Sequence, residues 1–142
     1  MTKTDASAPF PASAGPLRIP VSPGELLDKV TILELKDERI VDASKLANVR
    51  RELAILRDEA RANLQFDAAL LDFTARLKAV NARLWDCEDV IRDCERQKDF
   101  GERFIDTARA IYRNNDERAE IKRLINLHLG ALIVEEKSYA AY

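Results

Sequence analysis

The sequence has few of the residues from which most catalytic and metal-binding motifs are built. Its 142 residues include four glycines, two cysteines and one histidine, His128. The glycines are too far apart for a phosphate-binding P-loop or for the glycine motif that binds dinucleotides. A single histidine and the absence of a CxxC pair argue against the usual zinc motifs. We therefore expect no metal site and no cofactor.

The two cysteines, Cys87 and Cys94, are seven residues apart in a segment with a helical pattern. Seven residues at ~1.5 Å per residue separate them by ~10 Å along a helix. Bridged cysteines need Cα atoms within ~7 Å of each other. The spacing therefore predicts two free thiols, which are usual in the cytosol.

Long apolar runs and an excess of basic residues are also lacking. The longest apolar runs have about four residues, whereas a membrane-spanning helix needs ~20, so we expect no membrane span. The N-terminal segment has no apolar stretch of the kind found in secretory signals, which leads us to expect a cytoplasmic protein. With 23 Lys+Arg against 25 Asp+Glu, the net charge is −2. Nucleic acid is therefore not an expected partner.

The remaining composition is typical of a helical protein. Apolar residues make up 46% of the chain, charged residues 34% and aromatic residues only 6%. The prolines all lie within the first 24 residues. We expect residues 1–15 to form a disordered N-terminal extension, with residues 16–21 as an extended lead-in. Residues 16–142 are predicted to form a single helical domain.

Four helices are predicted from capping residues and apolar periodicity. The sequence Ser22-Pro23-Gly24-Glu25 is a capping box that starts a helix running to about Val41. The second helix starts at Asp42 or Ser44, and its stripe of Leu46, Val49, Leu53, Leu56 and Ala60 resembles a coiled-coil seam. The third helix starts at Asp67, and the spacing of residues 99–102 repeats the capping box before the fourth. Gly130 is expected just after the end of the fourth helix.

The helix lengths predict the architecture. The last two helices have about 30 residues each and the first two about 18, or ~45 Å against ~27 Å. We expect an all-α, four-helix bundle-like fold, with two short helices packed on a long antiparallel helical hairpin. An extended lead-in and a C-terminal tail flank the helices. Because the short pair cannot cover the long one, a homodimer or a helical protein partner is expected to cover the rest.

One polar stretch, residues 113–118, needs explanation. Six consecutive helical residues extend right round a helix. If the helix is unbroken, its apolar stripe places Asn115 and Arg118 inward, followed by Lys122. The alternative is that the helix breaks at Asn114, which would then cap a second helix.

Polar residues also interrupt the apolar faces of the first and third helices. The inward line of the third helix passes Asn81, Glu88 and either Arg92 or Glu95, and Glu88 and Arg92 have the i,i+4 spacing of a helical ion pair. Buried charges persist only when they are paired. We therefore expect the charges of three helices to converge. The candidate residues are Glu34, Asn81, Glu88, Arg92, Asn115, Arg118 and Lys122.

Four ordered blocks resemble a bacterial family of small proteins classed as a domain of unknown function. They are SPGELLDK from Ser22, LWD.ED.IR from Leu84, Y..ND.R...K from Tyr112 and EEKSY from Glu135. The resemblance covers about residues 18–139. It implies a single helical domain and no particular reaction or ligand.

Two functions remain open at this point. The first is an interaction or assembly module that self-associates through the long hairpin. The second is a small enzyme or binder with a charged site between the first, third and fourth helices. There, Glu34 and Glu88 would act as a base or hold Mg²⁺, while Arg92, Arg118 and Lys122 would hold a phosphate or carboxylate ligand.

Overall fold

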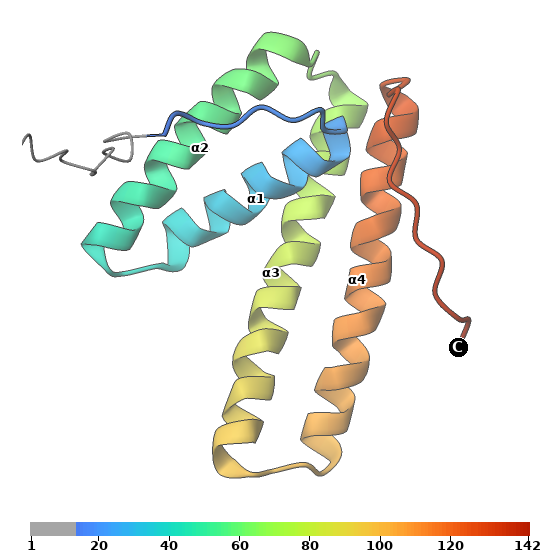
Figure 1. The fold of residues 1–142 in the computed structure, drawn as a ribbon. Helices are drawn as coiled ribbons and strands as arrows, with labels where there is room; N and C mark the ends of the chain where they lie inside the picture. Colours follow the sequence, from blue (N-terminus) through green and yellow to red (C-terminus); the bar gives the residue numbers. More distant parts are fainter. Residues whose placement is uncertain (1–13) are drawn as a thin grey trace, which may run out of the picture.

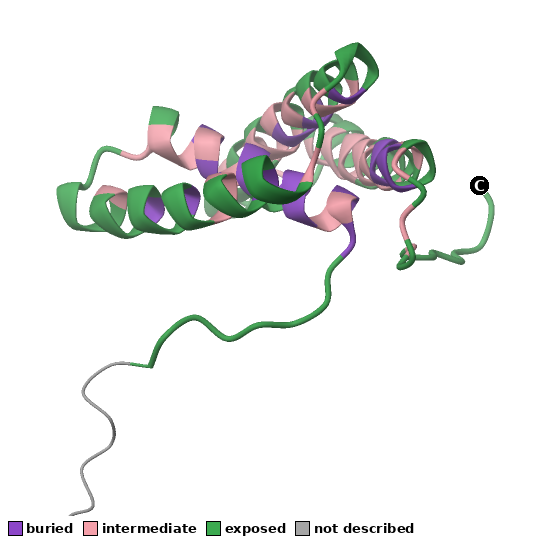
Figure 2. Ribbon diagram, turned by 90° about the horizontal axis from the view of Figure 1, so that it is seen from above, coloured by how far each residue is buried: buried purple, intermediate pink, exposed green. Residues whose placement is uncertain are grey.

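The computed structural model describes residues 14–142, so most of the predicted disordered extension, residues 1–13, lies outside the described residues. Four helices make up the fold (Figure 1), which confirms the predicted all-α class. They are α1 (Pro23–Arg39), α2 (Ala43–Asn63), α3 (Ala68–Gln97) and α4 (Glu102–His128). The described residues before α1 and the residues from Glu135 to the C-terminus contain no helix or strand, and nearly all of them are exposed (Figure 2).

Side chains cap three helices where the sequence predicts it. Ser22 Oγ accepts a hydrogen bond from the Glu25 N–H at 3.2 Å at the start of α1. Asp42 and Asp67 cap α2 and α3 in the same way. The start of α4 differs from the prediction, because its N-cap is Gly101 and no side chain caps it. The preceding Asp99 instead accepts a hydrogen bond from the Gly101 N–H.

The ends of the two long helices need left-handed backbone. Lys98 ends α3 with φ of 53°. Gly130 has φ of 59° just after α4, as predicted, because glycine adopts this conformation without steric cost.

The helix α1 is central to the packing. Within residues 14–142 it lies against α2, α3 and α4, while α3 and α4 pair along their lengths as an antiparallel hairpin. Figure 1 shows α1 crossing the upper part of this hairpin, with α2 lying along α1 and the lower part of the hairpin clear of both. The predicted packing of two short helices on the hairpin therefore holds directly for α1, whereas the backbone of α2 approaches only α1.

The hydrophobic core ends about halfway along the hairpin. On α3 it includes Leu70, Leu77 and Val80, which are all 0% exposed, and on α4 it includes Ile121 and Ile125. We call residues 84–113 the distal arm, which comprises the ends of α3 and α4 that meet at the turn. Cys94 is the one buried residue of the distal arm. Half of the hairpin therefore extends beyond the core.

Candidate functional site

A buried carboxylate, Asp28 of α1, lies where three helices meet. Its side chain is almost fully buried, with 1% of the residue exposed. Arg118 of α4 donates two hydrogen bonds to it, from Nε to Oδ1 at 2.9 Å and from Nη2 to Oδ2 at 2.5 Å. Asn81 of α3 donates from Nδ2 to the same Oδ1 at 2.9 Å. This two-pronged arginine–carboxylate pair fixes the orientation of α1 on the hairpin.

Lys122, one turn further along α4, extends this cluster to the tail. Its Nζ lies 2.7 Å from Glu25 Oε2 of α1 and 2.9 Å from Glu135 Oε2 of the C-terminal tail. Asp28 Oδ2 lies 4.0 Å from the same Nζ. We call Glu25, Asp28, Asn81, Arg118, Lys122 and Glu135 the Asp28 cluster. It joins α1, α3, α4 and the tail.

The start of α1 approaches α4 closely enough to form this cluster because residue 24 is glycine. The Gly24 N–H donates to Asn126 Oδ1 at 2.8 Å. A Cβ atom on residue 24 would lie 2.6 Å from the backbone oxygen of Lys122. Any other side chain would therefore push the two helices apart.

The charged state of the cluster follows from its contacts. The hydrogen bond to Asp28 outweighs burial and raises the pKa of Arg118. Burial acts to lower the pKa of Lys122, but the hydrogen bonds to Glu25 and Glu135 outweigh it and leave the pKa raised. The same hydrogen bond from Lys122 lowers the pKa of Glu135 below its ordinary value of 4.5. These three groups are therefore charged at neutral pH.

The cluster satisfies its own hydrogen-bonding needs. Among residues 14–142, every buried side-chain nitrogen and oxygen has a hydrogen-bond partner within the chain. No group of three or more histidine, cysteine or acidic side chains in this part of the chain could hold a metal ion. The geometry therefore favours a structural role for the cluster, in which it fixes the register of the helices.

The structure brings together three of the predicted site residues. Asn81, Arg118 and Lys122 meet in the Asp28 cluster. The helix α4 is continuous through residues 113–118, so the alternative break at Asn114 is wrong. Asn114 instead accepts a hydrogen bond from Arg83 of α3 at 2.8 Å.

The other predicted residues lie elsewhere. Glu34 forms ion pairs with Arg57 of α2 and Lys78 of α3, at 3.5 and 3.2 Å. Asn115 is half-buried beside the end of the tail, where it lines a cavity with Tyr142.

Glu88 and Arg92 bind each other at 2.6 Å, which confirms their predicted i,i+4 pairing. Both side chains are at least half exposed, so their predicted convergence with Arg118 and Lys122 is wrong. The reason lies in α1, which ends at Arg39. Arg39 reaches Asp86 at 2.7 Å, and α1 does not continue far enough to cover Glu88.

Three acidic members of the cluster, Asp28, Glu25 and Glu135, were not predicted from the sequence. Asp28 lies on the same helical face as Gly24 and Thr31, because positions i, i+4 and i+7 share a face. That spacing is the signal that could have identified it. In the sequence, Glu25 was interpreted as part of the capping box, and Glu135 was noted as the first residue of the EEKSY block. Only the return of the tail along α4 brings Glu135 to Lys122.

The fold and the cluster define an all-α protein with an internal ion-pair cluster and a protruding helical arm. The chain belongs to a family of unknown function (DUF6165), whose family model matches residues 17–142. This agrees with the resemblance to a domain of unknown function. Neither a curated protein nor a solved structure matches the chain. No helix within residues 14–142 is both long and apolar enough to cross a membrane.

Proposed function

We propose that this chain is an assembly module of the cytoplasm that forms a homodimer through its distal arm. The observation that best supports the proposal is that the burial of apolar side chains decreases along one face of α3. Leu70, Leu77, Leu84 and Ile91 follow each other at intervals of seven residues on α3 and therefore share a face. The first two are fully buried, whereas Leu84 and Ile91 are only half-buried. The apolar face of α3 therefore continues beyond the part of the helix that lies in the hydrophobic core.

The α4 side of the distal arm is apolar as well. Ile105 is 53% exposed and Tyr112 is 42% exposed. Phe104, Ala108 and Ile111 belong to the same stretch of α4 and are half-buried. Two helices alone bury only one stripe of each, whereas two hairpins pack as a four-helix bundle with a shared interior. A second copy of the arm supplies the same heptad face and completes such a bundle.

The charges of the distal arm favour an antiparallel second copy. Asp93 of α3 binds Arg103 of α4 at 2.9 Å, and Arg83 binds Glu117 at 2.8 Å. This register puts Arg109 at about the height of Asp89 along the arm. A two-fold axis across the arm at this height brings Arg109 of one copy level with Asp89 of the other.

The same axis brings Arg113 of one copy to within about two residues, or ~3 Å along the arm, of the height of Glu95 of the other. None of the four residues Asp89, Glu95, Arg109 and Arg113 forms an ion pair within residues 14–142. In this arrangement, oppositely charged side chains that have no ion-pair partner within residues 14–142 lie at similar heights along the two arms. This supports a second copy of the chain as the partner that covers the distal arm. A parallel arrangement would not bring Arg113 and Glu95 to similar heights.

Binding of a small anion between α1, α3 and α4 has less support. Asp28 already holds Arg118, and Glu25 and Glu135 already hold Lys122. A phosphate or carboxylate, with or without Mg²⁺, would have to displace partners that the chain itself supplies.

Sedimentation velocity on the full chain tests the proposal. We expect the unmodified protein to be dimeric at about tens of micromolar, and Ile105→Glu to weaken the dimer at least about 100-fold because it puts a charge into an apolar interface. Leu127→Glu is the matched control, since Leu127 lies on the same helix outside the arm and is similarly exposed, at 57%. An unmodified protein that is monomeric at this concentration contradicts the proposal.

A charge exchange tests the antiparallel arrangement separately. Arg113→Glu and Glu95→Arg should each weaken the dimer, because each brings two like charges to similar heights across the axis. The double variant Arg113→Glu/Glu95→Arg should restore most of the loss. Additive losses in the double variant would rule out this register.

A further inference from the structure

The C-terminal tail returns along α4 and is held there mainly by polar contacts. Residues 131–142 follow Gly130 and run beside the helix (Figure 1). The tail has no buried residue, and Leu132 is 99% exposed. Apolar burial, the usual source of binding energy for a packed segment, is therefore nearly absent here. What holds the tail must be its charged and aromatic side chains.

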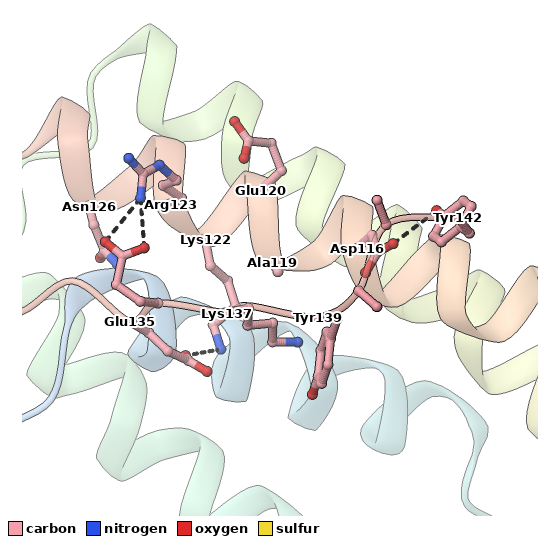
Figure 3. A pocket seen from close by; sticks show the side chains of 13 residues that line it. Asp116, Ala119, Glu120, Lys122, Arg123, Asn126, Glu135, Lys137, Tyr139 and Tyr142 are labelled. Carbon is pink, nitrogen blue, oxygen red and sulfur yellow. Dashed lines mark hydrogen bonds and ion pairs between the residues drawn. The ribbon is translucent and has the colours of Figure 1, made fainter.

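Two neighbouring carboxylates of the tail bind two neighbouring cations of α4. Glu135 binds Lys122 at 2.9 Å, and both oxygens of Glu136 accept hydrogen bonds from Arg123 at 3.1 Å. Figure 3 shows both side chains extending from α4 to the tail, with the Arg123 guanidinium and the Lys122 Nζ drawn on either side of it. Lys122 is only 8% exposed, so a largely buried positive charge lies beneath this part of the tail.

A third contact lies two turns away on α4. The Tyr142 hydroxyl donates to Asp116 Oδ2 at 2.9 Å, and its ring meets the edge of Tyr112 with centroids 5.2 Å apart. Between these anchors a cavity of about 470 Å³ remains open between the tail and α4. The tail therefore touches α4 at a few chemical anchors and does not fill the space beside it.

We propose that this face of α4 is a binding site for an extended acidic peptide of a partner protein, and that the tail occupies it in the partner's absence. The anchors recognise two adjacent carboxylates and an aromatic residue six positions further on. From Asp116 to Arg123 they extend over ~10 Å of helix, which is longer than a small anion. The six residues that follow Glu136, up to Tyr142, would reach ~20 Å if fully extended, so a peptide of this spacing covers the anchors with chain to spare. An incoming peptide would exchange carboxylate for carboxylate, so Lys122 would stay paired throughout.

A partner peptide can displace the tail from α4 because the tail is weakly held. The Glu136–Arg123 pair is exposed and contributes little, and Glu135 is itself about half exposed beside the buried Lys122. The tail competes mainly because it is tethered to its own site, which gives it a high effective concentration. Removing the two carboxylates of the tail should therefore open the site to a peptide in trans.

Fluorescence anisotropy with a labelled synthetic peptide of residues 131–142, ALIVEEKSYAAY, tests this. The full-chain variant Glu135→Gln/Glu136→Gln should bind the peptide about ten-fold more tightly than the unmodified protein does. Glu52→Gln/Asp58→Asn is the control, because it makes the same change of net charge at exposed positions of α2. Adding Arg123→Gln to the tail variant should abolish the gain, and circular dichroism checks that every variant is folded.

A second peptide separates recognition of carboxylates from general adhesion. The peptide ALIVQQKSYAAY, which lacks both carboxylates, should bind the tail variant at least about ten-fold less tightly. The proposal is overturned if the tail variant binds the acidic peptide no more tightly than the control variant does, or if both peptides bind equally.

Discussion

The two halves of the α3–α4 hairpin repeat the same pattern with different results. In the upper half, Leu77 is 0% exposed and lies in the core with α1 and α2. Seven and fourteen residues further along the same face, Leu84 and Ile91 are half-buried. The residue types are alike and the helix is continuous. Burial in this molecule is therefore set by where α1 ends.

Polar residues on the hairpin show the same contrast. Asn81 is buried and binds Asp28 of α1. Glu88, one heptad further, binds Arg92 and no other described residue, and it is exposed. Where α1 packs on this face of α3, a polar side chain joins the internal hydrogen-bond network. Beyond the end of α1, a polar side chain on the same face lies on the surface. The distal arm is the region that a second copy would convert into interior.

The largest expected effect compares apolar side chains in the two halves. Leu77→Ala should lower the free energy of unfolding by about 3–4 kcal/mol, since it leaves a cavity in the closed core. Ile91→Ala should cost about 1 kcal/mol in the monomer, where the side chain is only half-buried. Urea denaturation at low protein concentration measures both. Equal losses would contradict the division of the hairpin into two halves.

Charged residues give the next comparison. Asp28→Asn should cost about 3 kcal/mol, because it leaves the largely buried Arg118 guanidinium without its counter-charge. Glu88→Gln, its counterpart in the distal arm, should change stability by less than about 0.5 kcal/mol. Thermal and urea unfolding of the two variants give the values. If Glu88→Gln were the more damaging variant, the cluster would have been assigned to the wrong residues.

A smaller effect is expected where α1 meets α4. Gly24→Ala should destabilise the fold by about 2 kcal/mol, because the new Cβ lies 2.6 Å from a backbone oxygen that cannot move freely. Gly15→Ala is the control, since nothing lies within 4 Å of its Cβ position. Unfolding curves that coincide for the two variants would show that α1 does not need this close approach.

The smallest effect concerns the tail and depends on pH. Glu135 has its pKa lowered by the hydrogen bond from Lys122, so it contributes stability above its ordinary value of 4.5 and loses it as the pH falls through the lower, folded value. Glu135→Gln should therefore cost about 0.5 kcal/mol at neutral pH and nothing in strong acid. Glu120→Gln, at an exposed position of α4, should cost nothing at either pH. A cost for Glu135→Gln that persists in strong acid would exclude this ion pair as its source.

Local chemistry made much of the fold predictable. Ser22, Asp42 and Asp67 cap helices because their side chains accept hydrogen bonds from backbone N–H groups three residues later. Gly130 ends α4 for a reason that is equally local. The all-α class and the long hairpin followed from these signals and from the apolar periodicity.

The site was predicted only in part, because it depends on contacts between distant residues. The α4 pattern placed Arg118 and Lys122 inward correctly, but their partner Asp28 is 90 residues from Arg118 in the chain. Glu88 lies on the same face as Asn81, and helical spacing alone could not show that α1 ends before reaching it. The position of Glu135 depends on the path of a tail without secondary structure.

Amide hydrogen exchange of the full chain, measured from sub-micromolar to about tens of micromolar protein, tests the proposed dimer most directly. If a second copy covers the distal arm, its amides become more protected as the concentration rises, while those around Leu77 and Ile125 keep the same protection. Exchange in the arm that does not change with concentration would contradict the claim that a second copy covers it.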